Sequence, residues 1–129
     1  MANPYGYTRE IRAGFEGTVK KVREELAKEG FGVLTEINVK ETLKKKLNVN
    51  HEEYQILGAC NPPLAYQALQ AEREIGIMLP CNVAVYRHKG KTFVSAIRPT
   101  MTIASLDNPK LKEIAETVEE KLRAVIDRI

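Results

Sequence analysis

Apolar residues alternate with polar ones in five segments of the chain and recur at helical spacing in four others. A period of two predicts half-buried β-strands, whereas spacings of three and four predict amphipathic helices. The predicted strands cover about residues 5–12, 31–37, 53–59, 83–88 and 92–98. A turn over residues 88–91 joins the last two as a hairpin, and residues 99–105 are expected to form a loop.

Two of the predicted helices are long and strongly amphipathic. The first carries Phe15, Val19, Val22 and Leu26 at spacings of four, three and four. Gly30 follows it where a left-handed C-cap is required. The last helix runs from about residue 108 to residue 129, with Asn108 as its N-cap. Its apolar face is broad and comprises Leu111, Ile114, Val118, Leu122, Val125, Ile126 and Ile129.

Two shorter helices are predicted in the connections between strands. Asn38 is placed to cap one of them, with Glu41 three residues later in the capping-box position. Asn61 is placed to cap the other, and Pro62 occupies the first helical position, where a missing N–H costs nothing. After the second short helix, an apolar run ends at Pro80.

The order of elements is therefore β-α-β-α-β-α-β-β-α, within a single domain spanning residues 1–129. A tight hairpin requires antiparallel strands. Two long helices on one face of a mainly antiparallel, five-stranded sheet define an α+β fold. The two short helices lie in the connections.

Composition and charge exclude several classes of protein. The chain has 129 residues and a formal net charge of only +3. Its one cluster of basic residues, Lys40 with Lys44, Lys45 and Lys46, is typical of a solvated helix face. We therefore do not expect nucleic-acid binding. The apolar runs are far shorter than the roughly 20 residues that span a bilayer, so we expect no membrane segment. The N-terminus lacks a basic start followed by an apolar stretch, and we expect a cytoplasmic protein.

Two Cys-Asn pairs are the strongest candidates for chemistry. Cys60-Asn61 and Cys81-Asn82 contain the only cysteines, and each pair lies where a strand meets a structural break. Cys60 precedes a predicted helix N-terminus, which can stabilise a thiolate. If the two strands are antiparallel neighbours, the thiols lie close together; otherwise they are separated. The structural alternative makes Asn61 a helix cap, Asn82 a turn residue and both cysteines core residues.

Other candidates are weaker. Glu36 is expected on the opposite face of its strand from Phe31, Val33 and Ile37, either facing solvent or as a carboxylate in a pocket. Gly58, within an apolar run, suggests a bulge or a close approach of another chain segment. A zinc site needs more ligands than the two cysteines provide, and His51 and His88 show no ligand spacing, so the signal for a metal site is weak and no metal ligands are assigned. No pattern identifies a cofactor.

Several segments carry a resemblance to a known family. They are the start Tyr5–Tyr7, the strand Gly32–Ile37, the segment Ile56–Ala65 that contains Cys-Asn-Pro-Pro, and the segment Leu79–Val83 that contains Pro-Cys-Asn. On these residues, over nearly the whole chain, the sequence resembles the family catalogued as domain of unknown function 302. The resemblance implies a fold like that of the TATA-box-binding protein, with a curved antiparallel sheet backed by helices, and a homodimer. It implies no activity.

Three hypotheses of function remain open at this point. The first is a small homodimer that binds a small ligand or metal at a site lined by Cys60, Asn61, Cys81 and Asn82, with Glu36 as a further candidate. The second is a thiol redox enzyme or sensor that uses Cys60 as the reactive thiol and Cys81 as its resolving partner. The third is a structural dimer module without chemistry.

Overall fold

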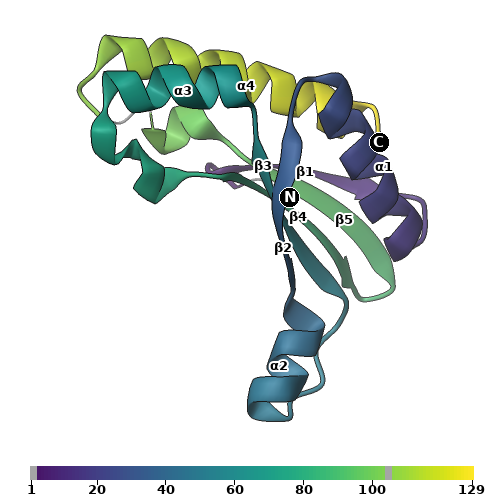
Figure 1. The fold of residues 1–129 in the computed structure, drawn as a ribbon. Helices are drawn as coiled ribbons and strands as arrows, with labels where there is room; N and C mark the ends of the chain where they lie inside the picture. Colours follow the sequence, from purple (N-terminus) through teal and green to yellow (C-terminus); the bar gives the residue numbers. More distant parts are fainter. Residues whose placement is uncertain (1–2, 104–105) are drawn as a thin grey trace.

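One antiparallel sheet organises the computed structural model, which describes residues 3–103 and 106–129 (Figure 1). The sheet order is β1-β5-β4-β3-β2, and every neighbouring pair is antiparallel. The predicted α+β class with a curved five-stranded sheet is confirmed. The strands are β1 (Gly6–Ile11), β2 (Gly32–Asn38), β3 (Tyr54–Cys60), β4 (Cys81–His88) and β5 (Lys91–Ile97).

The helices follow the predicted order, with two additions. They are α1 (Phe15–Lys28), α2 (Val39–Leu47), α3 (Pro62–Ala71) and α4 (Pro109–Asp127). The added elements are the 3-10 helices η1 (Arg73–Met78) and η2 (Pro99–Met101), so the start of the predicted loop is helical. The last two residues of that loop, 104–105, lie outside the described residues. Within the described chain, no helix combines the length and the apolar composition needed to cross a membrane.

The predicted helix ends are confirmed. Asn38 accepts a hydrogen bond from the Glu41 N–H at 3.0 Å, and Asn108 accepts one from the Lys110 N–H at 3.1 Å. Gly30 has a φ of 85°, a left-handed conformation that costs glycine little. The N–H of Phe31 then donates to the Leu26 carbonyl across the end of α1. These local contacts fix where α1, α2 and α4 begin or end.

The core lies between one face of the sheet and the long helices. Leu57, Val83 and Val85 point from the sheet into this core and have no exposed surface. Leu26 of α1 and Ile126 of α4 meet them from the helical side, also without exposure. Among residues 3–103 and 106–129, no helix covers the opposite face of the sheet (Figure 1). We call this opposite side the open face.

A bulge in β2 overturns the expected phase of Glu36. The register shifts between Val33 and Thr35, so Val33 pairs with Ala59 but Glu36 pairs with Leu57. Because residues two apart share a face, Glu36 lies on the helix-covered side together with Val33, not opposite to it. One extra residue in the strand therefore reverses the prediction for every residue that follows.

Helix α2 projects from the end of the sheet, away from the other helices (Figure 1). We call residues 37–50 the α2 arm. The helix packs against β2 and β3, but none of its residues is buried. Its apolar residues Val39 and Leu43 are only half-buried. The arm is thus held by its caps and its two strands rather than by the core.

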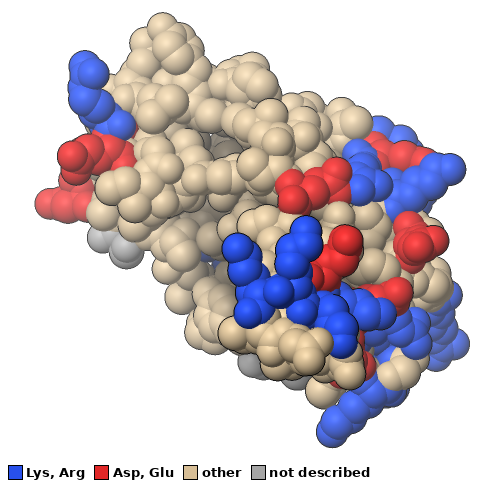
Figure 2. Space-filling model, turned by 60° about the horizontal axis from the view of Figure 1, so that its bottom comes forward, with Lys and Arg blue, Asp and Glu red and all other residues tan. Residues whose placement is uncertain are grey.

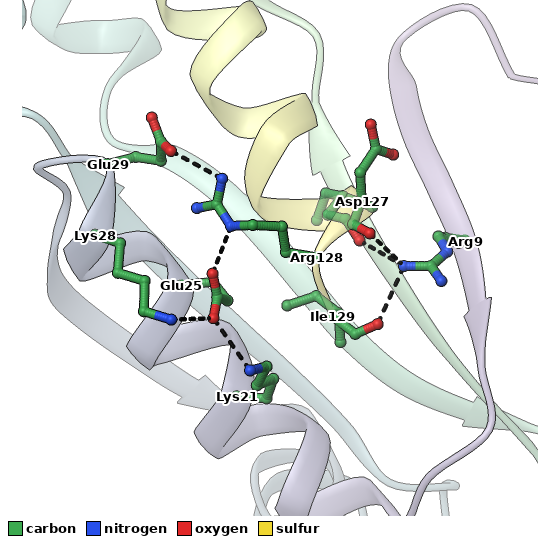
Figure 3. Close-up of polar contacts among 9 residues, drawn as sticks. Arg9, Lys21, Glu25, Lys28, Glu29, Asp127, Arg128 and Ile129 are labelled. Carbon is green, nitrogen blue, oxygen red and sulfur yellow. Dashed lines mark hydrogen bonds and ion pairs between the residues drawn. The ribbon is translucent and has the colours of Figure 1, made fainter.

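A polar network fastens the C-terminal end of α4 to α1 and β1 (Figure 3). Arg9 donates to the carbonyl oxygens of Ile126, Asp127 and Ile129 at 2.9–3.2 Å, which satisfies acceptors that a helix end leaves free. The carboxylate of the buried Glu25 accepts a hydrogen bond from the Arg128 guanidinium at 2.6 Å. The ammonium groups of Lys28 and Lys21 lie 2.8 and 3.1 Å from the same carboxylate. Hydrogen bonds from these cations lower the pKa of Glu25 to about 2.

Glu25 is expected to make folding sensitive to acid. Because its folded pKa of about 2 lies below the usual 4.5, its stabilising effect is complete above pH 4.5 and is lost as the pH falls towards 2. Glu25→Gln should lower the urea midpoint at neutral pH, and the difference from wild type should shrink through this window. Glu24→Gln, exposed on the same helix, is the control. A constant difference at all pH values would contradict this role.

Candidate functional site

The antiparallel pairing of β3 and β4 brings the two cysteines to one end of the sheet. Ala59 pairs with Cys81, so Cys60 is one residue beyond the paired position. Both cysteines are free, and both line one cavity together with Asn61. Three of the five predicted site residues therefore meet. We call this space the thiol cavity.

The thiol cavity is small and mostly apolar. Its volume is about 40 Å³, and Ala59, Ala65, Ala68 and Ala115 line it from the sheet and from α3 and α4. Small-molecule sites usually measure about 300–1,000 Å³, whereas a water needs about 10–15 Å³ by this measure. The cavity has room for a few atoms and no more.

Burial makes Cys81 a poor nucleophile. Its side chain is buried, and burial raises its pKa to about 11, with the nearby Cys60 as a second cause. Because the thiolate is the reactive form of cysteine, Cys81 is neutral and inert at physiological pH. Cys60 is only half-buried. The geometry thus supplies two neighbouring thiols but only one with access to reagents.

Asn61 uses both ends of its amide for structure. Its oxygen accepts from the Leu64 N–H at 3.5 Å, and its nitrogen donates to the Glu29 carbonyl at 3.2 Å. It therefore caps α3, as the structural alternative expected, and also ties α3 to the end of α1. Each end of the amide thus makes one hydrogen bond within the fold.

Asn82 lies on the open face, away from the thiol cavity. The structural alternative made it a turn residue, but β4 already begins at Cys81 and Asn82 pairs with Gly58 within the sheet. Because side chains alternate along a strand, Cys81 points into the core and Asn82 points out of it. Asn82 lines a different space, a hollow of about 350 Å³ on the open face.

Small residues and aromatic side chains shape this open-face hollow. Ala84, Ser95 and Gly6 leave room at its floor, while Tyr54 and Tyr86 form part of its wall. The ring centroids of Tyr54 and Tyr86 are 5.2 Å apart, and Phe93 continues the stack 5.3 Å from Tyr86. The hollow is lined by Asn3, Tyr5, Gly6, Thr8, Tyr54, Ile56, Asn82, Ala84, Tyr86, Ser95, Ala96 and Ile97.

The hollow contains polar groups but none of its lining residues is charged. The Oδ1 atom of Asn3 is buried and has no hydrogen-bond partner among the described residues. The hydroxyls of Thr8 and Ser95 bond to each other at 2.7 Å. Burial raises the pKa of Tyr86, and Tyr54 and Tyr5 raise it further, so its phenol stays neutral. Sequence reasoning missed this hollow, because its residues come together only through cross-strand register.

The remaining candidates lie apart from both spaces. Glu36 accepts hydrogen bonds from Arg23 and Gln55, and the bond from Arg23 lowers the pKa of its carboxyl. His88 bonds to Glu52, and His51 lies against Tyr54. Within residues 3–103 and 106–129, no three His, Cys, Asp or Glu side chains gather where they would hold a metal ion. Glu36 is a paired surface carboxylate in this structure.

Comparisons with known proteins agree with this architecture. A model of the family described as "Domain of unknown function DUF302" matches residues 7–129. The chain belongs to the DUF302 family. It is also similar to the crystal structure of an uncharacterised conserved DUF302 protein from Bacillus stearothermophilus, with 36% sequence identity, a TM-score of 0.92 and 98% of each chain covered. No curated protein matches. Membership of DUF302 confirms the resemblance found in the sequence.

Gly58 lies at the contact between β2, β3 and the turn before β4. A Cβ atom built there would lie 2.8 Å from the Pro80 ring and closer still to the Thr35 hydroxyl. The close approach expected at Gly58 is therefore present. We predict that Gly58→Ala lowers the free energy of unfolding by about 1–3 kcal/mol in chemical denaturation.

Gly32→Ala provides the matched control for Gly58→Ala, because a Cβ at Gly32 meets nothing within 4 Å. It should leave the stability unchanged or raise it by about 0.5–1 kcal/mol. Equal effects of the two substitutions would show that the contacts of Thr35 and Pro80 do not restrict position 58.

The two thiols should differ in reactivity. With a pKa of about 11, roughly one Cys81 side chain in a thousand is ionised at pH 8. We therefore expect iodoacetamide to alkylate Cys81 in Cys60→Ala at least about tenfold more slowly than Cys60 in Cys81→Ala. In urea the two rates should converge. Equal rates in the folded protein would contradict the buried, neutral state of Cys81.

Proposed function

We propose that this DUF302 domain binds a small, uncharged molecule in the open-face hollow. The observation that carries the proposal is the hollow itself, a space of about 350 Å³ on the open face that is walled by the stacked rings of Tyr54 and Tyr86 and lined by the amide of Asn82. Asn82 lines this hollow and is also one of the ligand-binding residues proposed from the sequence.

The size of the hollow favours it over the thiol cavity. Its volume of about 350 Å³ falls within the usual range for small-molecule sites, whereas the thiol cavity of about 40 Å³ falls far below it. A few polar groups around an apolar floor are also the usual composition of such sites. Ligand binding at the two thiols is therefore the weaker form of the original hypothesis.

Charge narrows the class of ligand. None of the described residues that line the hollow is an Asp, Glu, Lys, Arg or His, and a charged ligand would lose hydration without gaining a counter-ion. The neutral phenol of Tyr86 and the amides of Asn3 and Asn82 offer hydrogen bonds to a neutral partner. We infer a ligand with an apolar or aromatic body and at least one neutral hydrogen-bonding group.

The other hypotheses have less support. A redox enzyme that uses Cys60 and Cys81 stays a prediction. The raised pKa of Cys81 does not support it, because a neutral thiol is a poor nucleophile. The homodimer also stays a prediction. Neither requires the open-face hollow, so binding there is tested independently.

Benzamide and benzoate form a matched pair of probes, because they share a shape and differ in charge. We expect benzamide to shift the amide NMR signals of Asn82, Ala84 and Ser95, and benzoate to leave them unchanged. Ala84→Leu should fill the hollow and weaken benzamide binding at least about tenfold, a loss of about 1.4 kcal/mol. Ala13→Leu, at an exposed site outside the hollow, should bind normally.

Three results would count against the proposal. Equal binding of benzamide and benzoate would remove the argument from charge. Benzamide binding that survives Ala84→Leu would place the ligand elsewhere. Shifts at Cys60 and Cys81 in place of Asn82 would return the site to the thiol cavity.

A further inference from the structure

The α2 arm carries apolar side chains that the described residues leave largely exposed. Ile37 is 47% exposed, Leu47 66% and Val49 44%. Its helix has nine residues and none of them is buried. Helices shorter than about 12–15 residues are marginal without tertiary packing. The arm therefore has the character of a contact surface.

The α2 arm is also basic. Lys40, Lys44, Lys45 and Lys46 project from it against the single acid Glu41. No ion pair within the described residues involves any of the four lysines. Figure 2 looks towards this end of the molecule and shows Lys and Arg side chains gathered there, with Asp and Glu side chains among them. A partner for this surface must be acidic and apolar.

A groove beside η1 has these complementary properties. Its volume is about 350 Å³, and its charged lining residues are all acidic: Glu72, Glu74 and Asp107. At its edge Ile77 is 83% exposed and Met78 41%. We call it the η1 groove. Arg73, between the two glutamates in sequence, lines a separate hollow with Tyr66 and Leu69.

One chain cannot join these two surfaces. The α2 arm projects beyond the end of the sheet, whereas η1 lies at the side of the fold next to α3 (Figure 1). A second copy of the chain presents both surfaces again. Two copies related by a two-fold axis make the contact twice and close the assembly, whereas a repeated head-to-tail contact would form a chain of molecules.

We propose that the α2 arm of one copy docks into the η1 groove of a second copy, so that the four lysines face Glu72, Glu74 and Asp107. The contact would cover Leu47 and Val49 on one side and Ile77 and Met78 on the other. Complementary charge fixes the orientation, and burial of the apolar residues supplies the stability. The contact is independent of the open-face hollow.

A charge exchange tests this pairing by sedimentation equilibrium at low salt. Lys40→Glu with Lys45→Glu reverses the arm, and Glu72→Lys with Glu74→Lys reverses the groove. Because like charges face one another in each case, either reversal should raise the dissociation constant of the dimer at least about tenfold. Wild type should dissociate more readily as salt increases. The protein that carries all four substitutions should bind more tightly than either reversed protein, because opposite charges face one another again, although with fewer net charges than in the wild type.

Control variants separate this contact from a general effect of charge. Glu16→Lys with Glu24→Lys, and Arg12→Glu with Lys20→Glu, change the net charge equally at exposed positions outside both surfaces. They should leave the dissociation constant within about twofold of wild type. Circular dichroism checks that every variant folds.

Amide hydrogen exchange of the wild-type protein gives a second readout that needs no substitution. Exchange in α2 and η1 should slow as the protein concentration rises, while exchange on the open face stays constant. A monomeric wild type, a dimer that both reversals leave intact, or a fourfold variant that binds no more tightly than the two reversed proteins would each overturn the proposal. Concentration-dependent protection on the open face instead would assign the interface to the uncovered sheet.

Discussion

Burial of one sheet face beneath α1 and α4 is the contact on which the rest of the structure depends. Leu57, Val83 and Val85 lose all exposure on this side, and the long helices contribute Leu26 and Ile126. Because side chains alternate along a strand, burying these residues also determines which residues must face the other way. The open face, with its aromatic stack and its hollow, is therefore a direct consequence of the core.

The open face differs from an ordinary solvated face. An antiparallel sheet with one side in water usually carries polar residues on that side. Here Tyr54, Tyr86 and Phe93 stack across three strands, so their rings cover one another. Ala84 and Ser95 in the next row are too short to continue the stack, and the difference in side-chain length creates the hollow. The aromatic stack and the hollow both arise from the pairing register of the strands and not from a local sequence motif.

The sequence predicted what is local and missed what depends on pairing between distant strands. Asn38, Asn61 and Asn108 each cap the expected helix, because capping involves residues two or three positions apart. Glu36 was assigned to the wrong face because a bulge has no clear signal in a strand of seven residues. The aromatic row was missed because its three members lie up to 39 residues apart, from Tyr54 to Phe93.

The two Cys-Asn pairs show how one dipeptide takes on two roles. At Cys60-Asn61 the chain leaves the sheet for α3, so the strand alternation ends and both residues line the thiol cavity on the covered side. At Cys81-Asn82 the chain has already entered β4, so alternation sends Cys81 into the core and Asn82 to the open face. The sheet thus separates the side chains of Cys81 and Asn82, whereas the side chains of Cys60 and Asn61 stay on one side. The position of the strand boundary, and not the motif, decides which chemistry each pair can serve.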